Sequence, residues 1–176
     1  MNVIIAGSRN CKNRRFHEFL NEMEKLKTPL EKFIKSERDT VFCGEAQGAD
    51  EWGRQWALQN KIPIQYFPAD WENYGKAAGP LRNQHMVSES SLIIALWDFK
   101  SKGTYDLITN GIFQNVLMVI YVYPEDPNKT GWITCGKGLF EAFNRMHKKA
   151  YGKTSEDVEL VLDNYSPKNP YEEAEV

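Results

Sequence analysis

The chain has 176 residues, of which 41% are apolar, and its formal net charge at pH 7 is −2. This length and apolar content suit one domain of ordinary size with a core of its own. The nearly balanced charge excludes a global positive field that would attract nucleic acid or an anionic membrane, so any anion site must be local. The three cysteines, Cys11, Cys43 and Cys135, are far apart and form no CxxC pair, which predicts reduced thiols and no metal site.

The apolar run NVIIA at residues 2–6 is too short for the core of a signal peptide and is soon followed by polar residues. No apolar stretch of the sequence has the length that a membrane-spanning helix needs. We therefore expect a cytoplasmic protein that does not contact a membrane.

Five short runs rich in β-branched and aromatic residues predict strands. They lie at residues 2–6, 40–43, 62–67, 92–97 and 116–123, and each is almost continuously apolar, as in strands buried on both faces. Between them, apolar residues at helical spacing predict helices. Strands that alternate with helices favour an α/β fold with a parallel sheet. We expect a Rossmann-like three-layer fold, with about five parallel strands, over residues 1–123.

The pattern changes after residue 123. Residues 124–138 are typical of a loop, and apolar residues spaced along 139–150 predict one helix. We expect residues 124–176 to form a small helical C-terminal extension with a frayed acidic tail. This extension either covers an edge of the sheet or forms the interface of a homo-oligomer.

Four strand-to-helix junctions concentrate glycine, basic residues and aspartate. They are AGSRN at 6–10, CGEAQGAD at 43–50, PADWENYGKAAGPLRN at 68–83 and WDFKSKGTYD at 97–106. Each of them alone is more often a structural turn than a ligand site. In a parallel sheet, however, all four lie at the carboxyl ends of the strands, which is where open α/β folds bind ligands. The sequence therefore predicts one shared crevice.

The residue types in this crevice suit a nucleotide. Arginine and lysine bind phosphate oxygens, aspartate accepts hydrogen bonds from ribose or base, and glycine lets the backbone approach a ligand. Trp71 either stacks on a base or packs its long loop against the sheet. No cofactor and no metal ion is predicted. The residues predicted to bind the ligand are Gly7, Ser8, Arg9, Gly44, Glu45, Gly48, Asp50, Asp70, Trp71, Lys76, Gly79, Arg82, Asn83, Lys102, Gly103 and Thr104.

Four motifs resemble, in order and spacing, the YpsA-related branch of the SLOG superfamily, which also includes the DprA and Lonely Guy proteins. The motifs are GSR (7–9), GEAQGADEWGRQWA (44–57), FPADWENYGKAAGPLRNQHM (67–86) and SKGTYDLI (101–108). The resemblance covers about residues 1–123 and implies a Rossmann-like fold that binds nucleotides or nucleotide-derived ligands. Lonely Guy members are phosphoribohydrolases that release a base from a nucleoside 5′-monophosphate. Other members sense NAD-derived signals or bind single-stranded DNA.

The resemblance to the Lonely Guy enzymes is incomplete at the catalytic positions. Arg82 matches their catalytic arginine, but Leu107 stands where their PGGxGTxxE motif has a glutamate that acts in cleavage. Asp106 is one residue away, and a shift of one residue turns a side chain by about 100° around a helix. Glu45 also replaces a glycine of the second phosphate loop, which brings negative charge near the expected phosphate.

We therefore favour a protein that senses or sequesters a nucleotide or a nucleotide-derived ligand, such as ADP-ribose or another NAD-derived molecule. The alternative is an N-glycosidase of the phosphoribohydrolase type that acts on nucleoside 5′-monophosphates, with Arg82 and Asp106 as catalytic residues. A third reading, binding of single-stranded nucleic acid, needs a basic groove that follows several phosphates. The net charge and the acidic tail argue against that reading.

Overall fold

The structure is a computed structural model of the chain, and it describes residues 1–25, 27, 29–98, 100–123 and 131–135. The helix predicted at residues 139–150 and the acidic tail lie outside the described residues. No helix in the described ranges combines the length and apolar character required to cross a bilayer.

The described strands form one sheet in the order β3-β2-β1-β4-β5-β6. Strands β1 to β5 pair in parallel, with Val3 of β1 opposite Val41 of β2 and Leu92 of β4, so the predicted parallel sheet is confirmed. The strands are β1 (Asn2–Gly7), β2 (Thr40–Cys43), β3 (Ile64–Tyr66), β4 (Leu92–Trp97), β5 (Leu117–Val122) and β6 (Gly131–Cys135).

Strand β6 corrects the prediction of a loop over residues 124–138. Its sequence, GWITC, pairs antiparallel with β5 and adds an edge strand to the sheet. A run of five residues that contains one β-branched pair and begins with glycine gives a weak strand signal, because strand propensity depends mainly on the neighbouring strand.

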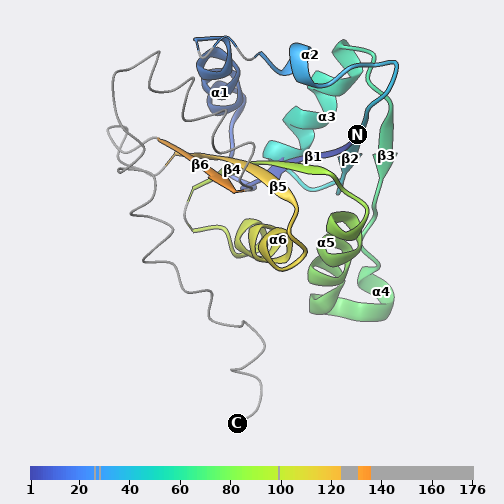
Figure 1. The fold of residues 1–176 in the computed structure, drawn as a ribbon. Coiled ribbons are helices and arrows are strands. Elements are labelled where there is room, and N and C mark those ends of the chain that lie inside the picture. The colour runs from blue at the N-terminus through green and yellow to red at the C-terminus, as the bar shows by residue number, and fades with distance from the viewer. Residues whose placement is uncertain (26, 28, 99, 124–130, 136–176) are drawn as a thin grey trace.

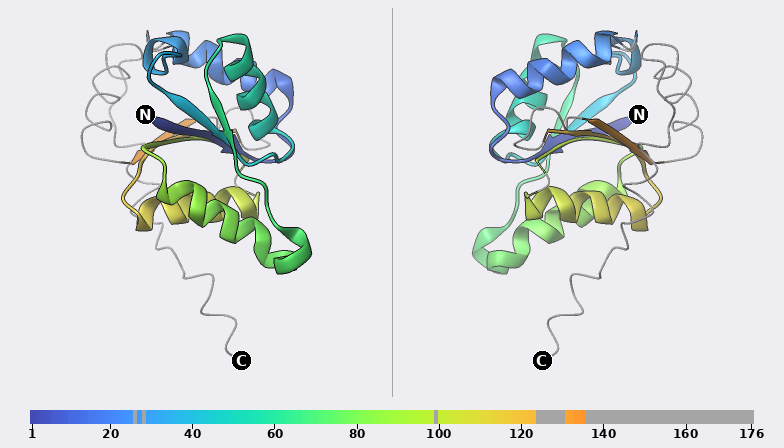
Figure 2. Two further views of the ribbon diagram at one scale, coloured as in Figure 1. Left: turned by 90° about the vertical axis from the view of Figure 1, so that its right-hand side faces the viewer. Right: turned by 90° about the vertical axis from the view of Figure 1, so that its left-hand side faces the viewer.

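Helices cover both faces of the sheet, which gives the predicted three layers (Figures 1 and 2). Helices α1 and α3 lie on one face, and α5 and α6 lie on the other. The helices are α1 (Asn13–Lys25), α2 (Leu30–Phe33), α3 (Ala49–Gln59), α4 (Trp71–Tyr74), α5 (Ala78–Ser88) and α6 (Lys102–Phe113), and a 3-10 turn, η1 (Gly75–Ala77), joins α4 to α5.

Alternation along the central strand β1 divides the core into two halves. Ile5 packs in the half that contains Phe19 of α1, whereas Ile4 packs in the half that contains Met86 of α5. Successive side chains of a strand point to opposite faces, so a continuous apolar run is what a strand covered on both faces requires. Each such side chain contributes roughly 1.5–3 kcal/mol when it is fully buried.

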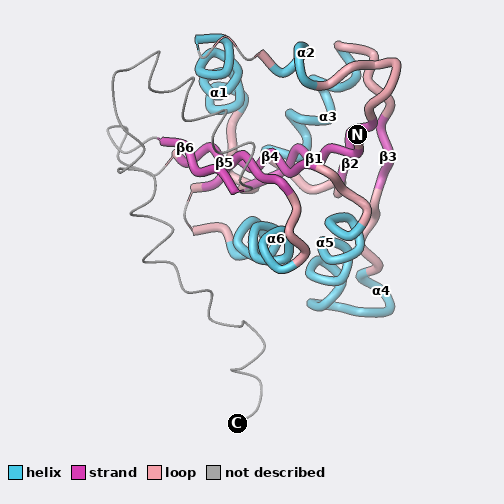
Figure 3. Tube along the Cα trace, viewed as in Figure 1, coloured by secondary structure: helices cyan, strands magenta, loops and turns pink. Residues whose placement is uncertain are grey.

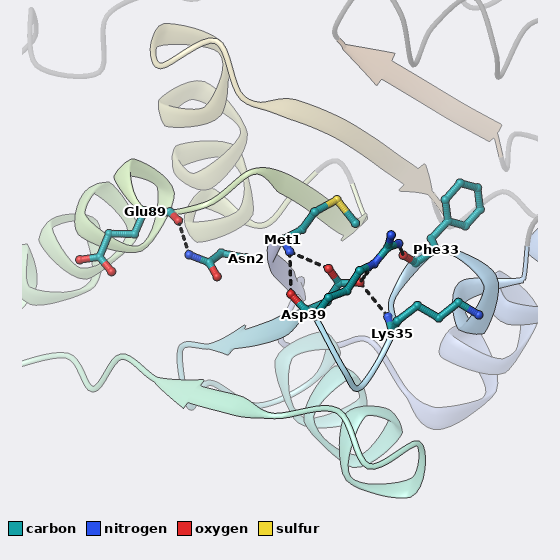
Figure 4. A network of polar contacts seen from close by, with 7 residues as sticks. Met1, Asn2, Phe33, Lys35, Asp39 and Glu89 are labelled. Carbon is teal, nitrogen blue, oxygen red and sulfur yellow. Dashed lines mark hydrogen bonds and ion pairs between the residues drawn. The ribbon is translucent and has the colours of Figure 1, made fainter.

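Hydrogen bonds to a buried carboxylate fix the position of the segment that precedes β2 (Figure 4). Asp39 accepts hydrogen bonds from the Met1 ammonium group at 2.6 Å, from the Lys35 backbone N–H at 2.7 Å and from Arg38 Nε at 3.2 Å. Burial by itself would raise the pKa of Asp39, but these hydrogen bonds outweigh it and lower the pKa. The network lies at the amino ends of β1 and β2, at the edge of the sheet opposite the strand-to-helix junctions.

The chain reverses its direction of winding between β1 and β4. The connection after β1 leads to α1 on one face, and the connection after β4 leads to α6 on the other face, as the loops in Figure 3 show. Ser8 lies just after β1 and Asp98 lies just after β4, and Ser8 Oγ donates to Asp98 Oδ1 at 2.9 Å. Open α/β sheets bind their ligands at such a switch point.

Candidate functional site

Adjoining cavities open at this switch point. The first cavity has a volume of about 280 Å³ and lies among the ends of β1, the β2–α3 junction and the N-terminal turns of α5 and α6. The second cavity, about 420 Å³, lies beside the β2–α3 loop and residues 68–69. The two share Arg9, Ala46, Trp71 and Arg82 as lining residues, so they adjoin one another, and we refer to them together as the cleft.

A third, more open cavity of about 570 Å³ extends the cleft toward the start of α1. It shares Arg9 and Ala46 with the other two and is also lined by Lys12 and Trp52. Arg9 therefore lies where all three cavities meet.

Most of the residues predicted to bind the ligand line the first cavity. Gly44 and Glu45 line the second cavity, and Gly48 lines the third. The predicted residues on the first cavity are Gly7, Arg9, Asp50, Trp71, Lys76, Gly79, Arg82, Asn83, Lys102, Gly103, Thr104 and Asp106.

Ser8 and Asp70 line none of these three cavities. Ser8 is fully buried and joins β1 to β4 through Asp98. Asp70 caps α4 by accepting from the Asn73 backbone N–H at 3.1 Å and from Asn73 Nδ2 at 2.7 Å. Both side chains therefore support the loops that surround the cleft.

Four basic side chains line the first cavity. Arg9, Lys76 and Lys102 are exposed at its walls, and Arg82 is partly buried. They come from three separate junctions of the chain, and the fold brings them to one place. A local cluster of cations is the arrangement that a chain with almost no net charge needs in order to bind an anion.

The N-terminus of α6 opens on the same cavity. Its cap residue, Ser101, makes no hydrogen bond from its side chain to the helix backbone, and the first turn contains no acidic residue. The first N–H groups of a helix have no partner within the helix and carry a partial positive charge. Lys102, Gly103 and Thr104 form that turn and line the cavity, so backbone dipole and lysine charge act together there.

The N-terminus of α3 has the opposite character. Its first turn contains Asp50 and Glu51, and Glu45 lies in the loop before it. These carboxylates already suit the helix dipole and oppose a second anion. The α6 start also has a carboxylate beside it, Asp98, which accepts from the Lys100 and Ser101 N–H groups. Its first turn, however, has Lys102 and no acid, so of the two helix starts α6 is the better phosphate site.

Arg82 is fixed between the first two cavities. Its Nη1 donates to the Gly44 carbonyl oxygen, and its Nε donates to Asn83 Oδ1 at 3.0 Å. A Cβ atom at Gly44 would overlap the Arg82 guanidinium and would lie 3.1 Å from Asp50 Oδ2. Glycine at this position is therefore what allows the arginine to reach across the cleft.

Asp106 also faces the first cavity and is held by Asn83. Asn83 Nδ2 donates to Asp106 Oδ2 at 2.8 Å and lies 3.3 Å from the Gly103 carbonyl oxygen. Burial raises the pKa of Asp106, and the hydrogen bond from Asn83 together with the charge of Arg82 only partly opposes the shift. Asn83 thus connects the arginine and the carboxylate of the site.

This placement bears on whether Asp106 can stand in for the glutamate that Leu107 replaces. Asp106 and Leu107 both line the first cavity, although a rotation of about 100° separates them on the helix. The cavity wraps over the first turns of α6 and contacts more than one face of the helix, so a shift of one residue does not remove the carboxylate.

Asp50 is the most deeply buried acid of the site. It is 4% exposed, and its Oδ1 accepts from the Gly7 backbone N–H at 3.3 Å. Burial raises its pKa to about 6, although the charge of Arg82 and hydrogen bonds from backbone N–H groups oppose the shift. Its protonation state therefore changes close to neutral pH.

Asp98 also belongs to these junctions, but its carboxylate accepts hydrogen bonds from the loops that surround the cleft. It accepts from Ser8 Oγ, from Asn10 Nδ2 at 2.8 Å and from the backbone N–H groups of Lys100 and Ser101. Burial would raise its pKa, but these hydrogen bonds lower it overall.

The residue list drawn from the sequence lacked several residues that line the first cavity. Pro80 and Met86 belong to the same motif as Arg82, and Ser101 precedes Lys102 at the start of α6. Serine followed by a helical pattern signals an N-cap and hence a helix start at the crevice. Ala46 has no chemical signal of its own, because it contributes only through the path of the β2–α3 loop.

No group of three or more histidine, cysteine, aspartate or glutamate side chains suited to a metal ion occurs within the described ranges. Residues 1–74 match the model of the YAcAr family, described as the YspA, cpYpsA-related SLOG family. This match supports the resemblance to the YpsA-related SLOG branch over the first two motifs, at residues 7–9 and 44–57, and over the start of the third. None of the curated proteins matches the chain.

Proposed function

We propose that the chain senses or sequesters a nucleotide-derived ligand, such as ADP-ribose or another NAD-derived molecule, and the match of residues 1–74 to the YpsA-related SLOG family model supports this proposal. Membership of this family suggests nucleotide-related binding or glycosidase activity. The proposed site is the cleft formed by the first two cavities.

The observation that carries the proposal is the convergence of Arg9, Lys76, Arg82 and Lys102 on one cavity beside the start of α6. Lysine and arginine with unpaired helix N–H groups are the usual partners of phosphate oxygens. Asp50 and Asp106 line the same cavity and provide acceptors for ribose hydroxyl groups.

The size of the cleft favours a ligand larger than a mononucleotide. The first cavity, about 280 Å³, adjoins the second, about 420 Å³, at four shared lining residues. ADP-ribose has two ribose units and a pyrophosphate, and we infer that it occupies both cavities.

A second function, cleavage of an N-glycosidic bond, is favoured by one specific observation. Asp106 faces the cavity beside Arg82, and its pKa is raised, as is common for a carboxyl group in an acid–base role. Against it, Asn83 occupies one carboxylate oxygen of Asp106. Leu107 at the neighbouring position adds no acid. Ligand binding without cleavage is therefore the favoured function, and hydrolysis is the alternative.

One experiment separates the two functions. The purified protein is incubated with nucleoside 5′-monophosphates, NAD and ADP-ribose, and the free pool and the pool released by denaturation are measured by mass spectrometry. Binding predicts that one compound leaves the free pool and returns intact on denaturation. Release of free base in excess of the protein concentration would establish hydrolysis instead, and the Asp106→Asn variant would then lose that activity.

A further inference from the structure

We propose that the second cavity is the base subsite of this cleft, and that Glu45 and Trp71 select a base with an exocyclic amino group, such as adenine. The inference rests on the proposed function, because it assigns one end of the same ligand. It concerns the second cavity, which the proposed phosphate site in the first cavity does not include.

The charged side chains that line only one of the two cavities orient the ligand. Lys76 and Lys102 line the first cavity but not the second, whereas Glu45 lines the second cavity but not the first. Phosphate therefore belongs in the first cavity, near α6. The second cavity is lined by the loop that leads into α3, with Glu45 on its wall, and it receives the other end of the ligand.

Trp71 provides a flat surface between the two cavities. Its side chain is 53% exposed and lines both of them. It stands at the first position of α4, where the hydrogen bonds from Asn73 to the cap residue Asp70 fix the helix start. Such an exposed indole offers a stacking face for a base, and stacking of this kind is worth about 1–3 kcal/mol per base.

Glu45 occupies a backbone conformation that suits glycine better. Its φ angle is 58°, which is the left-handed region, and its side chain is exposed on the wall of the second cavity. A residue with a Cβ atom in this region costs about 1 kcal/mol relative to glycine. The backbone at Glu45 is therefore less stable than it would be with glycine, and the same residue places a carboxylate in the cleft. Backbone strain of this kind is often found at functional sites, which favours a role for the carboxylate in ligand binding.

Two polar side chains that line the second cavity and not the first, Glu45 and Gln47, suit one base edge. The Glu45 carboxylate only accepts hydrogen bonds, whereas the Gln47 amide on the same wall both donates and accepts. Adenine presents an amino donor beside a ring acceptor, so the amino group pairs with Glu45 and the ring nitrogen with Gln47. Hypoxanthine presents a carbonyl oxygen in place of the amino group, and that oxygen opposes the carboxylate.

The test compares ADP-ribose with inosine diphosphate ribose by calorimetry, with ribose 5-phosphate as the probe for the phosphate end. The wild-type chain should bind ADP-ribose at least about tenfold more tightly than the inosine compound, because a site that pairs with an amino group rejects its carbonyl analogue. Glu45→Gln keeps the shape and the backbone and gives a group that can also donate. The preference should then fall to about threefold or less.

Two further variants make the result specific. Glu89→Gln changes an exposed acid at the far end of α5, where it pairs with His85, and should keep the full preference. Trp71→Leu should weaken ADP-ribose binding by about tenfold or more and weaken ribose 5-phosphate binding much less, because only the base loses its stacking face.

The outcomes separate this inference from the function on which it rests. Equal binding of ADP-ribose and inosine diphosphate ribose to the wild type, or a preference that Glu45→Gln leaves intact, overturns the base subsite while nucleotide binding stands. If neither of these compounds nor ribose 5-phosphate binds, the proposed function fails and the base subsite fails with it.

Discussion

Asn83 Nδ2 donates to Asp106 Oδ2 at 2.8 Å, while the Oδ1 atom of the same amide accepts from Arg82 Nε at 3.0 Å. The amide is 7% exposed, so both hydrogen bonds are largely protected from water. A single asparagine thus orients the cation and the carboxylate on two sides of the first cavity.

Asn83→Ala should weaken both the fold and the site. It leaves a carboxylate oxygen and an arginine N–H without their partner, and such a loss costs about 1–3 kcal/mol. Urea denaturation measures the stability, and calorimetry with ADP-ribose measures the affinity, which should fall at least tenfold. Gln84→Ala, at the exposed next position of α5, is the matched control, and a similar loss in that variant would refute the special role of Asn83.

Asn83→Ala should also shift the titration of Asp106. Burial raises the pKa of Asp106, and the hydrogen bond from Asn83 opposes the shift. Without that bond the pKa of Asp106 should rise further, which carbon-13 NMR of the labelled carboxyl group can follow. A lower pKa in the variant would contradict the account.

Asp50→Asn should make the protein more stable at neutral pH than the wild type. Burial raises the pKa of Asp50 to about 6, so the folded chain holds a proton that the unfolded chain releases near pH 4. Wild-type stability therefore falls, through this group, as the pH rises from 4 to 7. The advantage of Asp50→Asn should grow over that window to about 2–3 kcal/mol, and an advantage that is constant with pH would contradict the assignment.

The same group predicts a pH dependence of binding. Protonation of Asp50 removes a negative charge close to Arg82, so an anionic ligand should bind more tightly as the pH falls below about 6. ADP-ribose is a suitable probe, because its pyrophosphate diester does not titrate between pH 5 and 8. Asp50→Asn should reduce the dependence, and Asp106, whose pKa burial also raises, should account for what remains.

Gly44→Ala should damage the site more than the fold. A Cβ atom there would overlap the Arg82 guanidinium, which is the flexible end of its side chain and can move away. Loss of the bond to the Gly44 carbonyl should cost about 1 kcal/mol of stability, while ADP-ribose affinity should fall at least tenfold. Gly103→Ala, where a Cβ atom meets nothing within 4 Å, should leave stability unchanged or raise it by up to about 1 kcal/mol.

Asp39→Asn should destabilise the chain at neutral pH and much less in acid. The pKa of Asp39 is lowered because hydrogen bonds from the Met1 ammonium, Lys35 and Arg38 outweigh its burial. Its contribution is therefore present above the unfolded pKa near 4 and is lost as the pH falls through the lower folded value. We expect a loss of about 1–3 kcal/mol at pH 7, measured by urea denaturation on the chain that begins at Met1. An equal loss at pH 7 and pH 2 would speak against it.

Much of the fold could be predicted from the sequence because its signals are local. Continuous apolar runs such as residues 92–97 mark strands covered on both faces, and the structure has β4 at those residues. Helix α4 and strand β6 were not predicted. Helix α4 is only four residues long, and β6 depends on its antiparallel partner β5.

The membership of the cleft was harder to predict than its position. Arg82 and Lys102 could be predicted from their charge. Asp70 and Asp98 have the charge and the loop position of a ligand-binding residue, but they accept hydrogen bonds from backbone N–H groups of their own loops. Nothing in the sequence separates a carboxylate that caps a helix from one that faces a cavity. Only the hydrogen-bond partners separate them, and they depend on the path of the loop.

The most direct test of the central claim is a calorimetric titration of ADP-ribose into the wild-type chain and the Lys102→Met variant, with Lys32→Met as the control for a lysine away from the cleft. The account predicts a saturable isotherm with one ligand per chain. It also predicts a loss of affinity of about tenfold or more in Lys102→Met, because a charge-assisted bond to phosphate is removed, and no loss in Lys32→Met. An absence of saturable binding, or binding that Lys102→Met leaves unchanged, would contradict it.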